Sequence, residues 1–215
     1  MSKAKKSKET ELSNAPETFT KNEDRNFEIV EAQIKDDFCH YSFRIIKGKT
    51  AGFTFKVIGA GIIEDDMRKA FAKQNVHLAI IDDVFKYSEI EIEDLGKMHG
   101  HELAVLFHVN GFKIKGEGDD ESVILKGTKY VSAGGRLEIE SPKISLDSFS
   151  SYKWYKALKY AVDVSREEVA LYAEGKFTLP EKDDEPEVGL KQTKLKFAQP
   201  ADAEVEDTDF ANAAL

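Results

Sequence analysis

The chain has 215 residues, of which 41% are hydrophobic and 33% are charged, a balance typical of a soluble globular protein. Its net charge of −9 excludes nucleic-acid binding through overall positive charge, so any such binding needs a local basic surface. The chain has a single cysteine, Cys39, so it cannot form an internal disulfide, as is typical of proteins in a reducing compartment.

The sequence predicts neither export nor membrane insertion. Its Lys-rich start lacks the apolar stretch of a secretory signal, and no apolar run elsewhere reaches the length of a membrane span. We therefore expect a cytoplasmic protein with no membrane partner.

Composition divides the chain into three parts. Residues 1–25, rich in Lys, Ser, Glu and Thr, predict a disordered basic and polar arm. Residues 26–180 carry the apolar patterning and predict a single β-rich α+β domain. Residues 181–215 hold four Lys against ten Asp and Glu, which predicts a disordered acidic tail.

Alternating apolar residues predict strands over much of the central domain. The predicted strands are 27–34, 38–46, 53–58, 77–81, 102–115 with a kink at Asn110-Gly111, 122–130 and 137–140, with a further short strand at 90–92. In 38–46, for example, Cys39, Tyr41, Phe43 and Ile45 share one side.

Helical spacing appears in two places. Residues 65–74 predict a helix whose N-terminus carries acidic side chains, as the helix dipole favours. The C-terminal helical segment is predicted at 149–174, with a second helix beginning at the capping box Ser165-Arg166-Glu167-Glu168 and ending before Gly175.

Three strands, a helix and two further strands follow one another in the order of an OB barrel. The predicted fold class is therefore α+β: an OB-like antiparallel β barrel or sheet with an inserted helix and a C-terminal helical segment. Whether the sheet closes into a barrel stays open at this point.

Two motifs suggest other chemistry, and each has a simpler explanation. Gly59-x-Gly61 lies between a strand and a helix as in a dinucleotide-binding unit, but Glu64 at the third glycine position, followed by two aspartates, would repel a pyrophosphate. His99-Gly100-His101 supplies two metal ligands where a stable site has three or four. We predict no metal site, no cofactor and, since no catalytic constellation is recognisable, no enzymatic activity. A nucleotide- or metal-binding enzyme is the third-ranked alternative.

Basic side chains recur on the predicted outer side of the strands and in the adjoining turns. Such cations can neutralise phosphates, and exposed aromatic rings can stack on bases. The predicted nucleic-acid-binding residues are Arg44, Lys47, Lys49, Lys56, Phe112, Lys113, Lys115, Lys126, Lys129 and Tyr130. The alternative is that lysines on solvent-facing strands only prevent aggregation.

The acidic tail ends in Glu204-Val205-Glu206-Asp207-Thr208-Asp209-Phe210. An OB-like core followed by an acidic tail with a late aromatic residue resembles the phage-type single-stranded DNA-binding proteins. The resemblance implies that a sheet face and its loops hold single-stranded DNA. It also implies that the tail competes with DNA and recruits replication or recombination proteins, which makes Asp207, Asp209 and Phe210 partner-binding residues.

Other segments resemble an uncharacterised protein of bacterial phages and prophages. They are Ile34-Lys35-Asp36-Asp37-Phe38-Cys39, Asn110-Gly111-Phe112-Lys113 and Tyr152-Lys153-Trp154-Tyr155. This resemblance implies a phage origin, and hence the host cytoplasm, but no activity.

One tail peptide suggests a partner. Gln192, Leu195 and Phe197 fit Q-x-x-L-x-F, which resembles the peptides that dock on sliding clamps. Leu195 and Phe197 would fill an apolar groove, and Gln192 would hydrogen-bond its rim.

Two hypotheses follow. The first is a phage-type protein that binds single-stranded DNA and supports DNA replication or recombination, with a homodimer as one possible assembly. The second is a phage structural or protein-interaction module, including an inhibitor of host enzymes, that has no nucleic-acid ligand.

Overall fold

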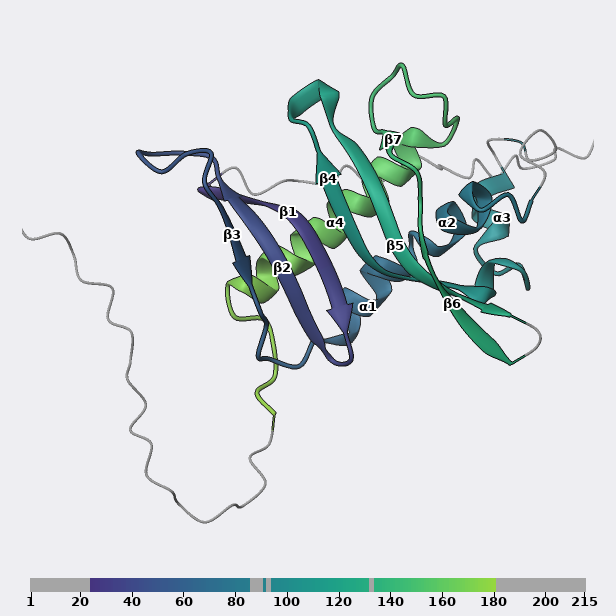
Figure 1. Cartoon of the computed structure of the whole chain (residues 1–215), viewed down its shortest axis with the longest axis horizontal. Helices are drawn as coiled ribbons and strands as arrows, with labels where there is room; N and C mark the ends of the chain where they lie inside the picture. The colour runs from purple at the N-terminus through teal and green to yellow at the C-terminus, as the bar shows by residue number, and fades with distance from the viewer. Residues whose placement is uncertain (1–23, 86–90, 92–93, 132–133, 181–215) are drawn as a thin grey trace, which may run out of the picture. The chain divides into compact units, whose positions relative to one another are not determined.

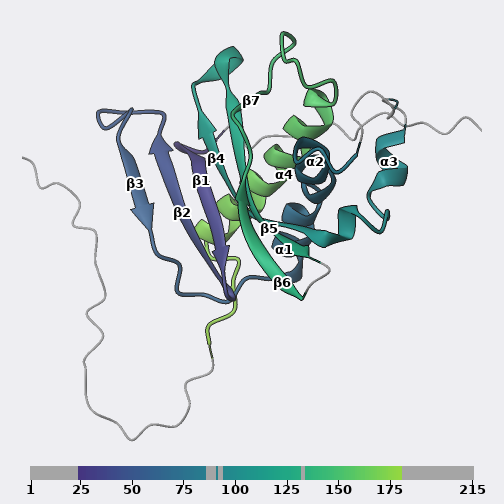
Figure 2. The same cartoon turned by 45° about the vertical axis from the view of Figure 1, so that its right-hand side comes forward.

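The computed structural model describes residues 24–85, 91, 94–131 and 134–180. The chain divides into two units, Met1–Pro180 and Glu181–Leu215, and the described residues all belong to the first. That unit is built on a seven-stranded antiparallel sheet with helices packed against one face (Figures 1 and 2).

The strands run in the spatial order β3-β2-β1-β4-β5-β6, with β7 paired to β5. They are β1 (Phe27–Lys35), β2 (Phe38–Ile45), β3 (Thr54–Val57), β4 (Phe107–Lys115), β5 (Ser122–Val131), β6 (Gly135–Glu140) and β7 (Ile144–Ser145). Because β3 and β6 stand at the two ends of this order, the sheet is open.

The helices lie between and after the strands. They are α1 (Asp65–Ala72), α2 (Asn75–Ile81), α3 (Leu95–Met98) and α4 (Tyr155–Ala173), with short 3-10 turns at Ala104–Leu106 and Gly118–Asp120. Helix α4 contacts β1 and β2, while α1 and α2 contact β4. None of the helices in the described ranges combines the length and the apolar character needed to cross a bilayer.

The core forms where the apolar side of each strand meets the helices. Phe112 of β4 packs on Phe71 of α1 with ring centroids 5.7 Å apart, and Tyr41 of β2 meets Tyr172 of α4 at 6.1 Å. Alternation along the strands therefore does what the sequence predicts: it buries one side of the sheet, and none of the described helices packs on the other side.

The predicted class, α+β with an antiparallel sheet, is confirmed, as are the strands at both ends of the sheet and the helix at α1. The kink predicted at Asn110-Gly111 is a register shift between Val109 and Gly111 in the β4–β5 ladder. A Cβ on Gly111 would lie 2.9 Å from the carbonyl oxygen of Ala32, so this close approach of β4 to β1 requires glycine.

Two predicted elements are wrong. Residues 77–81 form the end of helix α2 rather than a strand, because nearly all of their side chains are buried and a continuous apolar run carries no periodicity. No second helix begins at Ser165, since α4 runs through it. The Ser165 hydroxyl instead donates to the carbonyl of Ala161 and accepts from Gln74 Nε2 at 2.7 Å. The strand predicted at 90–92 falls largely outside the described residues.

His77 gives the fold a pH dependence. Its ring is 1% exposed and its Nδ1 lies 2.8 Å from the hydroxyl of Tyr152. Burial, with a smaller contribution from His99, lowers the pKa of His77 to about 3. The unfolded chain therefore takes up a proton near pH 6.5 that the folded chain does not, and stability falls as pH drops below that value.

We predict that His77→Gln removes this dependence. Between pH 7 and pH 5 the parent protein should lose about 2 kcal/mol of unfolding free energy through this group, and the variant should lose correspondingly less. Urea unfolding at the two pH values measures the difference. Equal losses in both proteins would show that His77 titrates normally in the folded state.

Candidate nucleic-acid interface

The face of the sheet opposite the helices, here the open face, collects most of the predicted basic residues. Strand register and alternation place the following side chains on it: Glu28, Glu31, Arg44, Lys56, Lys113, Lys115, Lys126, Tyr130, Arg136, Glu138 and Glu140. Basic side chains outnumber acidic ones in this set, so the open face is more positive than the chain as a whole.

Glu31 lies at the centre of this face, between two lysines. Its carboxylate accepts a hydrogen bond from Lys126 at 2.8 Å and lies 3.4 Å from Lys113 Nζ. Burial alone would raise the pKa of Glu31, but Lys126 and Lys113 outweigh burial and hold that pKa below its usual range. Two ammonium groups thus share one carboxylate, and the cluster Lys113–Glu31–Lys126 carries a net positive charge.

Tyr130 provides an aromatic surface further along β5. Its side chain is 45% exposed, its ring meets that of His108 edge-on at 5.2 Å, and it lies opposite Arg136 of β6. An exposed ring held in place on a sheet face, with a basic residue opposite it on the next strand, is the kind of surface on which an unpaired base stacks.

Arg44 is on the open face but is bound by acidic side chains. Its guanidinium contacts Glu28 of the neighbouring strand and Glu117 of the β4–β5 turn. Glu28 also meets Arg166 of α4 at 3.2 Å, and Arg166 meets Glu121 at 3.2 Å. These groups hold structural elements together, so Arg44 has less capacity to bind phosphate than the sequence alone indicates.

The other predicted residues are spread around this face. Lys56 and Lys115 are exposed on it, and Lys47 and Lys49 lie in the turn between β2 and β3. The tail residues Gln192, Leu195, Phe197, Asp207, Asp209 and Phe210 lie outside the described residues.

Two predicted site residues lie elsewhere. Phe112 is 0% exposed in the core, so it cannot stack on a base. Lys129 is on the helix-covered side, where its ammonium lies 2.5 Å from Asp82 at the end of α2. Both positions follow from the alternation of side chains along a strand, in which residues an odd number of positions apart point to opposite faces. Phe112 is next to the outward Lys113, and Lys129 is three positions after the outward Lys126, so both point inward.

Sequence reasoning missed the acidic members of the open face. Glu31 faces Lys113 across the β1–β4 ladder, and Glu140 faces Lys126 across the β5–β6 ladder. Glu31 and Lys113 lie on strands far apart in the sequence, so only the strand order reveals that pair, whereas Glu140 and Lys126 lie on consecutive strands.

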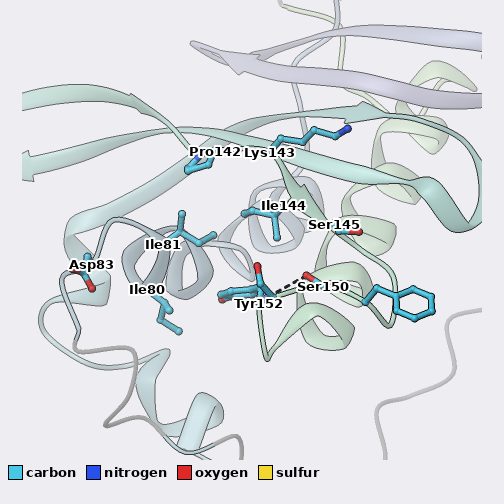
Figure 3. A pocket seen from close by; sticks show the side chains of 11 residues that line it. Ile80, Ile81, Asp83, Pro142, Lys143, Ile144, Ser145, Ser150 and Tyr152 are labelled. Atoms are coloured by element: carbon cyan, nitrogen blue, oxygen red, sulfur yellow. Dashed lines mark hydrogen bonds between the residues drawn. The ribbon is translucent and has the colours of Figure 1, made fainter.

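A cavity of about 590 Å³ lies away from the open face, between the end of α2, strand β7 and the loop before α4 (Figure 3). Ile80, Ile144 and Tyr152 form apolar walls, and the Ser150 hydroxyl accepts a hydrogen bond from the Tyr152 backbone at 3.2 Å. Its lining, as far as the structure describes it, includes none of the residues predicted to bind nucleic acid.

The Gly59-x-Gly61 motif has a structural role. The hydroxyl of Tyr172 donates to the carbonyl of Gly61 and accepts from its N–H at 3.2 Å, and a Cβ on Gly59 would lie 2.1 Å from the carbonyl oxygen of Cys39. The glycines thus allow the chain to pass between β2 and α4. Within the described ranges, no group of three or more His, Cys, Asp and Glu side chains gathers as metal ligands would.

Comparison with protein families, with curated proteins and with solved structures finds no match to this chain.

We predict that Gly59→Ala destabilises the fold by about 1–3 kcal/mol, because the added methyl group meets backbone atoms that cannot move away. Thermal or urea unfolding measures this loss. The matched control is Gly96→Ala, where the methyl group has no neighbour within 4 Å and α3 accepts alanine readily. If both substitutions are neutral, the passage past Cys39 and Tyr172 does not require glycine.

Proposed function

We propose that this protein binds single-stranded DNA on the open face and has no catalytic role. The observation that carries the proposal is the Lys113–Glu31–Lys126 cluster with Tyr130 further along the same face, on a sheet side that the helices leave uncovered. Phosphate neutralisation and base stacking are the two interactions that sequence-independent single-strand binding uses.

The mechanism is an exchange of anions. In the free protein the Glu31 carboxylate forms ion pairs with the ammonium groups of Lys113 and Lys126. A DNA phosphate competes with Glu31 for these two lysines. Lys56, Lys115 and Arg136 extend the positive surface to either side of this cluster. Because part of the positive charge is already neutralised, binding is moderate in affinity and falls as salt rises.

The setting follows from the phage resemblance. The protein supports DNA replication or recombination in the cytoplasm of the host, and the C-terminal peptides around Gln192 and Phe210 recruit the proteins involved. The proposal does not depend on an OB-like barrel, since an open sheet face presents the same lysines and Tyr130.

A second candidate is a protein-interaction module without a nucleic-acid ligand. It is favoured by the same ion pairs, because Glu31 already satisfies Lys113 and Lys126 without a phosphate. The chain's net charge of −9 also opposes the approach of a polyanion.

Substitution of Glu31 separates the candidates. Glu31→Gln removes the competing carboxylate and should tighten binding to an oligothymidylate, whereas Lys113→Gln combined with Lys126→Gln should weaken it by about tenfold and lower the salt slope by about 1.4. Fluorescence anisotropy over a salt series measures both quantities. Lys129→Gln, on the opposite side of the sheet, is the control and should leave affinity unchanged.

Binding that Glu31→Gln weakens as much as the lysine substitutions do would contradict anion exchange at this cluster. No binding at low salt by any of the proteins, each shown to be folded by its thermal transition, would favour the interaction module.

A further inference from the structure

Strand β3 forms one end of the sheet, and its outer edge is unusually apolar. Among the described strands only β2 pairs with it, so the backbone groups along its other side have no strand partner. Phe53, Phe55 and Ile58 are 62%, 46% and 77% exposed. Natural sheets generally protect such an edge, because a free edge with apolar side chains pairs readily with another strand.

The apolar side chains at this edge continue an aromatic run inside the protein. Phe27 meets Phe43 edge-on at 5.5 Å, and Phe43 stacks on Phe55 at 5.4 Å. These rings lie on the helix side of the sheet, and α4 contacts β1 and β2. The run therefore reaches the edge at Phe55, a residue that is still 46% exposed.

The charges near this edge are separated along its length. Residues 45–58 contain Lys47, Lys49 and Lys56 and no acidic residue. The chain then leads to exposed Glu64 and Asp65 at the start of α1. Figure 1 shows the turn between β2 and β3 projecting at one end of the sheet and α1 beginning toward the other.

This pattern complements itself under a two-fold rotation. If β3 pairs with β3 of a second copy in antiparallel register centred on Phe55, the two Phe55 rings face each other and Phe53 faces Val57. Lys56 then faces Thr54, so like charges are not directly opposite. The basic turn of each copy extends past the partner's β3 toward its acidic α1 start.

We propose that β3 is the interface of a homodimer in which two sheets join edge to edge. The contact is isologous and closed, so it leaves no free β3 edge for further growth. The open faces of the two copies become one continuous surface, with Lys56 of each copy next to the β3–β3 contact. The inference goes beyond DNA binding and does not rest on it.

The test is the oligomeric state of the full chain, measured by sedimentation velocity over a wide range of concentration. The expected result is a dimer that Phe55→Glu converts to a monomer. Phe149→Glu, at a 95% exposed position outside the β3 edge, should leave the dimer intact. A parent protein that is monomeric at every concentration, or a dimer indifferent to Phe55→Glu, would overturn the proposal.

Cysteine cross-linking tests the register without disrupting the interface. Cys39 is fully buried, and burial raises the pKa of its thiol to about 12, so it does not interfere. Under mild oxidation Phe55→Cys should form a disulfide-linked dimer in high yield, and Phe149→Cys should not. Equal yields from both variants would overturn the proposal.

A different outcome would be that residues 1–23 of the same chain cover the edge. That arrangement gives a monomer in which the β3 amides are protected from hydrogen exchange until the segment is deleted, and this outcome too would overturn the homodimer.

Discussion

The sheet depends on how its two halves are joined between β1 and β4. The paired positions of that ladder run only from Glu31↔Lys113 to Gln33↔Gly111. Beyond it, Arg166 of α4 makes the connection, meeting Glu28 of β1 and Glu121 at the start of β5, each at 3.2 Å. Its side chain is 10% exposed, so loss of one partner leaves a poorly solvated charge, a defect that costs about 3–5 kcal/mol in buried pairs. One guanidinium thus fixes α4 against both halves.

This junction also decides which charges can meet a ligand. Glu28 serves both Arg166 and Arg44, so the positive charge of Arg44 is used within the protein. The lysines next to the short ladder are different, because two of them share the single carboxylate of Glu31. These lysines lie on the β4–β5 side of the open face, the side that also carries Tyr130. In the sequence Arg44 and Lys126 look equally able to bind phosphate. In the structure they differ, because Arg44 is bound by Glu28 and Glu117 whereas Lys126 shares Glu31 with Lys113.

Much of the fold was predictable because one side of the sheet is buried and the other is not. In β2 the alternation of Cys39, Tyr41 and Phe43 with polar residues fixes both the strand and its inward side. Helix α2 was not predictable in the same way, since it is surrounded by the core and its apolar run has no period. The site was predictable only in part. Alternation identified Lys113 and Lys126 as outward, but Glu31 between them depends on strand order, which no local pattern encodes.

The position of Glu31 links stability to the proposed binding. It is a member of the only β1–β4 pairs that the described strands show, and its carboxylate holds Lys113 of β4 and Lys126 of β5 together with β1. A phosphate that takes over the two lysines replaces one bridging anion by another, so charge balance at the junction is kept while the carboxylate is released. The ion pair is therefore suited to exchange, because it is partly exposed and its loss is offset by the ligand. The ion pairs of Arg166 are more buried, so a phosphate cannot replace their carboxylates. They hold the sheet together in both the free and the proposed DNA-bound protein.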